Sequence, residues 1–440
     1  MSEAATEIRE GRISSVELVT ACLDRIAEVE PDVQAWAFLD RDHALQQAKA
    51  LDERRALGQA VGPLHGVPIG VKDIFDTGDM PTELGSPLWA GRTPRDDAVA
   101  VSRLRSAGAV IMGKTVTTEY AYFHPGKTRN PHDKERTPGG SSSGSAAAVA
   151  ALMVPGAIGS QTNGSVIRPA AYCGVIGFKP THGVIPRTGA LLLSRALDHV
   201  GVFARSVEDA ALLAELMAGF DDEDPDTRPI ARPPLASVAV SEPPLPPRFA
   251  FVRSAVWDRA EPATHEAFAE LVDVLGDAVV EVDLGERFGR AIGWQKTVME
   301  VEMAHNFHRD YETGRDRLSD PLRQLIERGR KYPAIEYTAG LAGSAALNAA
   351  LDSVFDEYDA ILTPATLGEA PRGDATGDPI FCTTWSYLGT PAVSLPLLRG
   401  EAGLPLGVQL VGRRGNDARL LRTAHWLVKT LARQLKDETS

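Results

Sequence analysis

Residues 3–60 carry the hydrophobic periodicity of helices. Apolar residues recur there at spacings of three and four, as on one face of an α-helix: Val16, Val19, Leu23, Ile26 and Val29. Ser15 stands before this run and is a plausible N-cap, because its hydroxyl can accept a hydrogen bond from the first turn. A second helix is expected over 41–56. The N-terminal region is therefore predicted to be mostly helical.

From residue 61 to about 205 the pattern changes to short apolar runs between loops rich in Gly, Pro and Ser. The strand-like runs lie at 67–71, 109–112, 154–158 and 175–178. Strands that alternate with helical stretches are typical of α/β layers. The segment 145–154 (SAAAVAALMV) is rich in Ala and carries no charge, which predicts a helix buried on most of its surface.

Residues 221–248 are dense in proline and acidic residues, which favours a long connection on the surface. The alternative is a linker between two domains. We favour the surface connection, because a strand-like run resumes at once at 249–252. Beyond it the pattern predicts helices over about 260–276, 290–330 and 344–357, and strands at 360–362, 392–395 and 407–411.

The composition excludes several classes of protein. The chain has 440 residues, 43% of them hydrophobic, which is enough for two or three domains or one large α/β unit. A net charge of −13, from 46 basic and 59 acidic residues, argues against nucleic acid or an anionic membrane as the main partner. Cys22, Cys173 and Cys382 are too few and too far apart for a disulfide framework or a CxxC metal site.

The charged first residues and the short length of the apolar runs favour a cytoplasmic protein. The first residues are charged and lack the apolar stretch of a signal peptide. No uncharged apolar run reaches the roughly 18 residues that a transmembrane helix needs.

Two glycine-containing motifs match known patterns in an unsuitable context. Residues 108–115 (GAVIMGKT) fit the phosphate loop GxxxxGK[ST], but the residues between the glycines are an apolar strand rather than a loop that holds phosphates. Residues 140–144 (GSSSG) fit the nucleophile elbow GxSxG, with Ser142 as nucleophile. That interpretation needs a downstream histidine, and the candidates stand in no distinctive motif: His182, His199, His305, His308 and His425. A flexible linker is disfavoured because an Ala-rich helix follows.

A second Gly/Ser turn and one lysine are stronger candidates for chemistry. Residues 159–170 (GSQTNGSVIRPA) lie between two apolar strands, and such a turn can point several backbone N–H groups into one concavity, as oxyanion holes require. An ordinary tight loop is the alternative. Lys72 ends the strand-like run 66–71, and if it is desolvated its pKa falls and it can act as a base. A surface or ion-paired lysine is the alternative.

Taken together, these segments resemble the amidase signature family. The strongest stretch is 138–180, which holds the Gly/Ser-rich signature and the nucleophile turn of that family. Further matching stretches are 66–77 (GVPIGVKDIFDT), 108–115, 361–365 (ILTPA), 388–396 (LGTPAVSLP) and 404–412 (LPLGVQLVG). The resemblance covers about residues 8–425. It implies one large α/β domain over residues 1–440, with a mixed central β-sheet covered by helices.

The family uses a Ser–Ser–Lys triad and no metal or cofactor. Carried over residue by residue, Ser165 resembles the nucleophile, Ser141 the bridging serine and Lys72 the base. A serine hydroxyl needs an adjacent base to become a good nucleophile, and neutral Lys72 can take the proton through Ser141. From an ordinary pKa of about 10.4, a lysine that is neutral near pH 7 needs a drop of roughly three units, or about 4 kcal/mol. For Ser142 and Ser143 we favour turn and capping roles.

The resemblance also implies an oxyanion hole and a substrate pocket. The donors that stabilise the oxyanion resemble the N–H groups of Thr162, Asn163, Gly164 and Ser165. Tyr122 and Phe123, within the segment 120–124, are candidates for the acyl pocket, as is the segment 385–390, although aromatic residues are more often core. In the family the bridging serine follows a cis peptide bond, so we predict a cis bond between Gly140 and Ser141.

The turn departs from the commonest family pattern at three positions. Asp is frequent where this chain has Gln161, and Gly where it has Asn163; N–H donation survives both changes, and Asn tolerates a positive φ. Arg168 stands one place later than usual, an order that resembles the malonamidase branch. There the arginine is thought to hold a substrate carboxylate, to which bidentate geometry is suited. An arginine that braces the loop through an ion pair is the equal alternative.

The resemblance therefore implies an amidase that cleaves a carboxylic amide, with a small anionic amide as a candidate, to an acid and ammonia or an amine. One alternative is a carbamate, urea-type or ester hydrolase with the same triad. Another is the amidase component of a glutamine-dependent amidotransferase, and a third is an inert binding protein, against which the intact triad argues. We expect a small-molecule amide as partner, no nucleic acid and no membrane, and leave a homodimer open.

Overall fold

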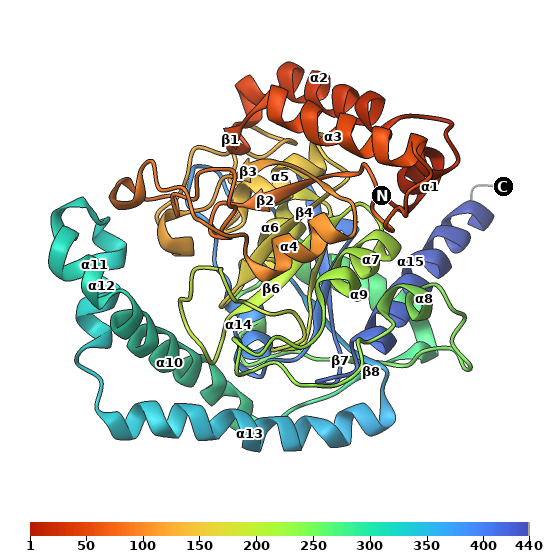
Figure 1. The fold of residues 1–440 in the computed structure, drawn as a ribbon. Helices are drawn as coiled ribbons and strands as arrows, with labels where there is room; N and C mark the ends of the chain where they lie inside the picture. The colour runs from red at the N-terminus through yellow and green to blue at the C-terminus, as the bar shows by residue number, and fades with distance from the viewer. Residues whose placement is uncertain (439–440) are drawn as a thin grey trace.

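One mixed sheet of eleven strands runs through the molecule (Figure 1). The computed structural model describes residues 1–438. The strands are β1 (Trp36–Leu39), β2 (Pro68–Lys72), β3 (Val110–Thr115), β4 (Gly156–Gln161), β5 (Ile176–Lys179), β6 (His199–Ala204), β7 (Phe249–Phe251), β8 (Val279–Glu281), β9 (Ala360–Pro364), β10 (Ala392–Arg399) and β11 (Pro405–Val411). Their order in the sheet is β1-β3-β2-β4-β6-β5-β10-β11-β9-β7-β8.

Parallel pairing brings three strand ends to one edge of the sheet. Strand β2 lies between β3 and β4 and is parallel to both. The carboxyl ends of these strands therefore meet at the same edge, where ligands bind in many α/β proteins. Strand β6 is antiparallel to β4, with Gln161 opposite His199, so the segment before β6 reaches this edge as well.

Fifteen α-helices lie against and around the sheet in the described residues. They are α1 (Ser2–Arg9), α2 (Ser15–Val33), α3 (Arg41–Ala56), α4 (Val99–Ser106), α5 (Ser143–Ala150), α6 (Ile167–Cys173), α7 (Val207–Met217), α8 (Leu235–Ala239), α9 (Pro262–Leu275), α10 (Arg290–Asn306), α11 (His308–Gly314), α12 (Asp320–Gly329), α13 (Ala334–Glu357), α14 (Ile380–Tyr387) and α15 (Asp417–Glu438). Helix α10 packs against α12, α13 and α14. None of the helices within residues 1–438 has the length and apolar character that a bilayer crossing requires.

Helix α5 is buried because its side chains are small. Its residues from Ser143 to Val149 are all buried, as the Ala-rich sequence predicts. A Cβ at Gly144 would lie 2.3 Å from the carbonyl oxygen of Ala35 and 2.3 Å from the backbone nitrogen of Val116. A larger residue is therefore excluded there, and the backbone of α5 lies against the chain that follows β3.

The predicted α/β fold with a mixed sheet and helical cover is confirmed. The predicted N-cap is wrong by one residue: Ser14 caps α2, its hydroxyl accepting from the Glu17 N–H while Glu17 accepts from the Ser14 N–H. Strand β1 separates α2 from α3 and has no counterpart in the sequence prediction. The segment 221–248 lies between α7 and β7 and contains the short helix α8.

Candidate active site

Lys72 ends β2 inside the protein, with no solvent exposure. Its Nζ donates hydrogen bonds to Ser141 Oγ at 2.7 Å and to Ser160 Oγ at 2.9 Å. Ser141 precedes α5, and Ser160 lies in β4, the strand beside β2. The end of the central strand and the Gly/Ser segment therefore meet at one amine.

Burial sets the charge of this amine. Desolvation lowers the Lys72 pKa well below its ordinary value of 10.5, and the buried Asp198 opposes the fall only in part. Among the described residues, no carboxylate lies within salt-bridge distance of Nζ. A buried ammonium without a paired anion is costly, so the neutral amine is favoured, and a neutral amine can accept a proton.

The peptide bond between Gly140 and Ser141 is cis, as predicted. Both flanks of this bond are held by the protein. The Gly140 carbonyl accepts from the Arg168 guanidinium at 2.7 Å, and the Ser141 carbonyl accepts from the Thr118 N–H at 3.2 Å. The Ser141 hydroxyl is thereby held against Lys72.

The side chain of Gln161 ties together the turn that follows β4. Its Oε1 accepts from the N–H groups of Val166 at 2.8 Å and Ile167 at 2.9 Å, and its Nε2 donates to Ser386 Oγ at 2.8 Å. Gln161 is 1% exposed. One amide side chain thus closes the loop from residue 161 to 167 and attaches it to α14.

The turn offers a group of backbone donors to its concave side. Within residues 1–438, the N–H groups of residues 162–165 have no protein acceptor outside regular strand pairing. Side chains hold the turn instead: Thr162 donates to Asp198 at 2.6 Å, and Asn163 accepts from Thr383 at 2.8 Å. Asn163 does not adopt a positive φ, so the expected tolerance of Asn for that conformation is not used. The predicted oxyanion donors therefore lie on one braced turn.

Ser165, the predicted nucleophile, is 9% exposed and lines a small cavity of about 20 Å³. The cavity wall also includes the predicted oxyanion and substrate residues, which are Thr162, Asn163, Gly164, Arg168, Tyr122 and Phe123. Lys72 and Ser141 lie outside this lining and approach it through Arg168, which holds the carbonyl before Ser141. Among the described residues, Ser141 hydrogen-bonds to Lys72 but not to Ser165, so the contact between the two serines stays a prediction.

Arg168 is 3% exposed, and its guanidinium donates to two carbonyl oxygens, those of Gly140 at 2.7 Å and Gly377 at 2.8 Å. Its Nε is buried without a partner among the described residues, and the guanidinium lies 5.7 Å from the centre of the Phe123 ring. The ion pair that the bracing alternative expects is absent from the part of the chain that the structure describes. Arg168 therefore braces the loop through carbonyl groups and leaves its positive charge without a carboxylate.

The sequence comparisons now define the family. A profile of the family described as Amidase matches residues 17–421. This chain belongs to the amidase family. It is an enzyme that hydrolyses amide C–N bonds.

The relatives of this amidase-family chain cover almost its whole length. One relative, from Chloroflexus aggregans, is a component of glutamyl-tRNA(Gln) amidotransferase and is 35% identical over 96% of this chain and 94% of its own. The corresponding component from Acidothermus cellulolyticus is also 35% identical, over 96% and 92%. The peptide amidase of Stenotrophomonas maltophilia has a TM-score of 0.85 at 30% identity and covers 98% of this chain and 96% of its own.

A further solved structure shares the fold still more closely. It belongs to an "unexpected vestigial protein complex" linked to an s-triazine catabolic enzyme, and it has a TM-score of 0.90 at 30% identity, covering 97% of this chain and 98% of its own. None of the proteins named here is a malonamidase, so that branch of the family stays a prediction.

The two weaker motifs of this amidase have structural roles. Lys114, from the apparent phosphate loop, is buried within β3 and donates to the Phe75 and Pro81 carbonyls at 2.9 and 3.0 Å. The Ser142 hydroxyl donates to the Ser160 carbonyl at 3.2 Å, and no histidine of the described chain hydrogen-bonds to it. Neither motif therefore carries the chemistry that its pattern suggests.

Ser160 and Asp198 belong to this site and were missed by the sequence analysis. Ser160 is the second partner of Lys72, and Asp198 accepts from Thr162 and from the N–H groups of Leu193 and Ser194. Burial raises the Asp198 pKa to about 6. An isolated acid within an apolar stretch was the available signal for Asp198, since an acid is seldom buried without partners.

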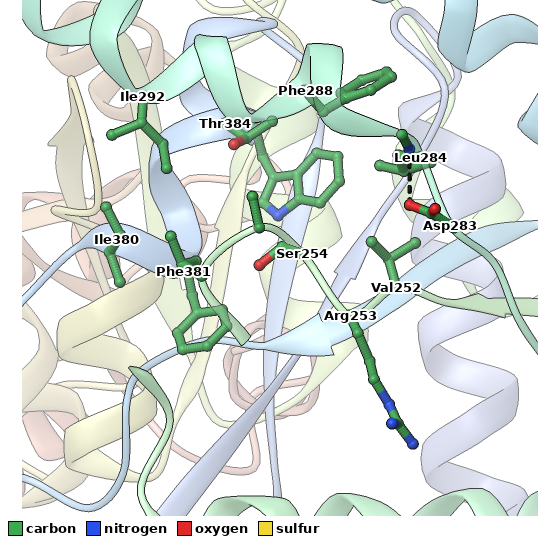
Figure 2. Close-up of a pocket in the computed structure, with 14 residues that line it drawn as sticks. Val252, Arg253, Ser254, Asp283, Leu284, Phe288, Ile292, Ile380, Phe381 and Thr384 are labelled. Carbon is green, nitrogen blue, oxygen red and sulfur yellow. Dashed lines mark hydrogen bonds between the residues drawn. The ribbon is translucent and has the colours of Figure 1, made fainter. Parts of the chain in front are cut away.

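A second cavity, of about 40 Å³, lies on another side of α14 (Figure 2). Figure 2 shows mainly apolar walls, with Val252, Leu284, Phe288, Ile292, Ile380 and Phe381 around it. It shares no lining residue with the cavity of Ser165 in the described chain. Helix α14 therefore supports the nucleophile turn with one side and closes this separate cavity with another.

Replacement of Gln161 tests how much the nucleophile turn depends on one side chain. In Gln161→Leu the N–H groups of Val166 and Ile167 lose their acceptor while they stay buried, at about 1–3 kcal/mol for each unpaired group. We expect a loss of roughly 2 kcal/mol or more in the free energy of unfolding by urea. The exposed Gln59→Leu is the matched control. Equal stability of the two variants would contradict the bracing role.

Proposed function

We propose that this chain hydrolyses a small carboxylic amide through an acyl-enzyme on Ser165. The supporting observation is the buried Lys72 amine, 2.7 Å from the Ser141 hydroxyl, beside a cavity that Ser165 lines. Lys72 is the base, Ser141 carries the proton, and Ser165 is the nucleophile. The same residues are the ones that resemble the triad of the family.

In the first half of the reaction, Ser165 Oγ attacks the amide carbon as its proton passes to Ser141 Oγ and the Ser141 proton passes to Lys72 Nζ. The carbonyl oxygen becomes an oxyanion. Collapse of this intermediate breaks the C–N bond, and the proton returns from Lys72 through Ser141 to the leaving nitrogen. The leaving group is ammonia or an amine, and the acyl group stays on Ser165 as an ester.

In the second half, water attacks the ester carbon and its proton follows the same path to Lys72. The acid leaves when Ser165 Oγ takes a proton back through Ser141. Both half-reactions pass through an oxyanion that the N–H groups of residues 162–165 stabilise. Loss of one such donor typically costs about 3–4 kcal/mol, because the donors are held in place before the charge develops.

The cavity favours a small acyl group with a negative charge. Its volume of about 20 Å³ leaves little room beyond Tyr122 and Phe123. Arg168 lines the same cavity, and no carboxylate of the described chain neutralises it. A carboxylate on the acyl side of the substrate would supply the missing charge through hydrogen bonds of the strong, charge-assisted kind. The half-amide of a small dicarboxylic acid has this form.

The relatives favour a second candidate function. The first two relatives named above are components of glutamyl-tRNA(Gln) amidotransferase, which favours a role as the ammonia-releasing component of a glutamine-dependent amidotransferase. In that case glutamine is the amide, and turnover depends on partner chains. The two candidates are separated by testing the chain alone on a panel of half-amides, glutamine, neutral amides, carbamates and esters. Hydrolysis of glutamine only after partner chains are added would select the amidotransferase component.

Ser165→Ala tests the nucleophile. We expect amide hydrolysis to fall by about 10⁴-fold or more, the scale seen when a serine nucleophile is removed, and a fluorophosphonate to label the wild type but not the variant. Ser143→Ala is the matched control, since it removes a buried hydroxyl that donates to the Val116 carbonyl. Labelling of the Ser165→Ala variant, or equal losses in both variants, would refute the assignment.

Arg168→Met tests the preference for anionic amides. Because Arg168 also holds the Gly140 carbonyl, we expect kcat to fall for every substrate. The decisive quantity is the ratio of kcat/KM for succinamate to kcat/KM for butanamide. A lost charged hydrogen bond is worth about 1.5–3 kcal/mol, so the ratio should fall by about tenfold or more. A ratio that stays constant while both rates fall would leave Arg168 a bracing role only.

A further inference from the structure

A large cavity lies beside the candidate active site. Its volume is about 790 Å³, far more than that of the cavity lined by Ser165. Its walls come from the segments 84–92 and 189–192 and from the junction of α10 and α11, near residues 306–317. A volume of this size is typical of sites for small organic ligands, which run from about 300 to 1,000 Å³.

The charges of this cavity are unevenly neutralised. Arg92 forms a bidentate pair with Asp76 at 2.7 and 2.8 Å, and both line the cavity. Asp310 accepts from Tyr120 at 2.7 Å and from Trp89 at 3.2 Å. Arg309 and Arg317 also line it, and neither forms a salt bridge in residues 1–438. Two guanidinium groups therefore face the cavity without a paired anion, in a chain whose net charge is −13.

The remaining walls are largely apolar. Leu84, Leu88, Leu191 and Leu192 line the cavity together with the rings of Trp89 and Phe307. The floor is held in place, because the Phe307 ring packs edge-on against Tyr120 at 5.0 Å and the Tyr120 hydroxyl is bonded to Asp310. An apolar wall that is fixed before binding favours a ligand with an apolar body, since neither side has to reorganise.

The large cavity and the reaction cavity have separate linings but share a segment. Leu191 and Leu192 line the former, and Leu193 lines the latter. Asn306, at the end of α10 and in the wall of the large cavity, donates to the Leu193 carbonyl at 2.9 Å. Among residues 1–438, none lines both cavities. A ligand in the large cavity is therefore distinct from the acyl group that Ser165 would hold.

We propose that this cavity is a second binding site, for a small organic anion with an apolar body. The anionic head, a carboxylate or sulfonate, lies between Arg309 and Arg317, because guanidinium groups match planar oxyanions in both charge and geometry. The apolar body lies against Trp89, Phe307 and the leucine residues. The proposal stands whether or not Ser165 is the nucleophile, because none of these residues belongs to the reaction.

A pair of fluorescent probes that differ in charge tests the site. The anion 8-anilinonaphthalene-1-sulfonate and its neutral analogue N-phenyl-1-naphthylamine are titrated against the wild type and the double variant Arg309→Ala/Arg317→Ala. We expect saturable binding of the anion by the wild type and at least about tenfold weaker binding by the double variant, since two charged hydrogen-bonding groups are lost. Binding of the neutral probe should change by less than about twofold.

Two controls keep the result specific. Arg54→Ala/Arg228→Ala removes two exposed arginines elsewhere that form no salt bridge in the described chain, so it makes the same change in net charge. Arg168→Met alters the reaction cavity and the loop that Arg168 braces, but it removes no residue that lines the large cavity. Both controls should bind the anion as the wild type does. The proposal is overturned if the anion binds the Arg309/Arg317 variant unchanged, if the charge control weakens binding equally, or if Arg168→Met alone abolishes binding.

Discussion

The burial of one amine against one hydroxyl is the interaction on which the candidate active site depends. Lys72 is completely enclosed, and its Nζ donates to the hydroxyl groups of Ser141 and Ser160. A lysine in water is charged at neutral pH and cannot take a proton. The sheet lowers the pKa of Lys72 by excluding water, because β2 lies between two parallel strands and is buried along its whole length.

The surrounding contacts hold in place the groups that we propose to react with this amine. Arg168 holds the carbonyl before Ser141, Gln161 closes the turn that contains Ser165, and Asp198 attaches Thr162 to the segment that precedes β6. Each is a buried polar side chain whose partners are mostly backbone groups. Such contacts fix a loop more firmly than packing alone, because a broken hydrogen bond in the interior is not replaced by water.

The sequence predicted the architecture better than it predicted the contacts that support the candidate site. Apolar runs marked β2, β3, β4 and β5, because a strand that is buried on both faces is a continuous hydrophobic stretch. Strand β1 escaped because it is only four residues long and lies between two long helices. Ser14 and Ser15 are both good N-caps by residue type, and the choice depends on where the chain turns, which local sequence does not fix. At the candidate site, Lys72, Ser141 and Ser165 stand in recognisable sequence motifs. Ser160 and Asp198 come to the site because distant segments pair in the sheet. Periodicity and residue spacing do not reveal such pairing.

The charge of Lys72 can be measured directly by NMR of protein labelled with ¹⁵N at the lysine Nζ. Lys114 and Lys179 are also buried, with pKa values lowered to about 8 and about 7, so the Lys72 signal must be assigned by its loss in Lys72→Met. We predict that Lys72 titrates well below 10.5 and is a neutral amine at the pH where the enzyme is active. An ammonium signal that persists until it titrates together with the exposed lysines would contradict the role of Lys72 as the base.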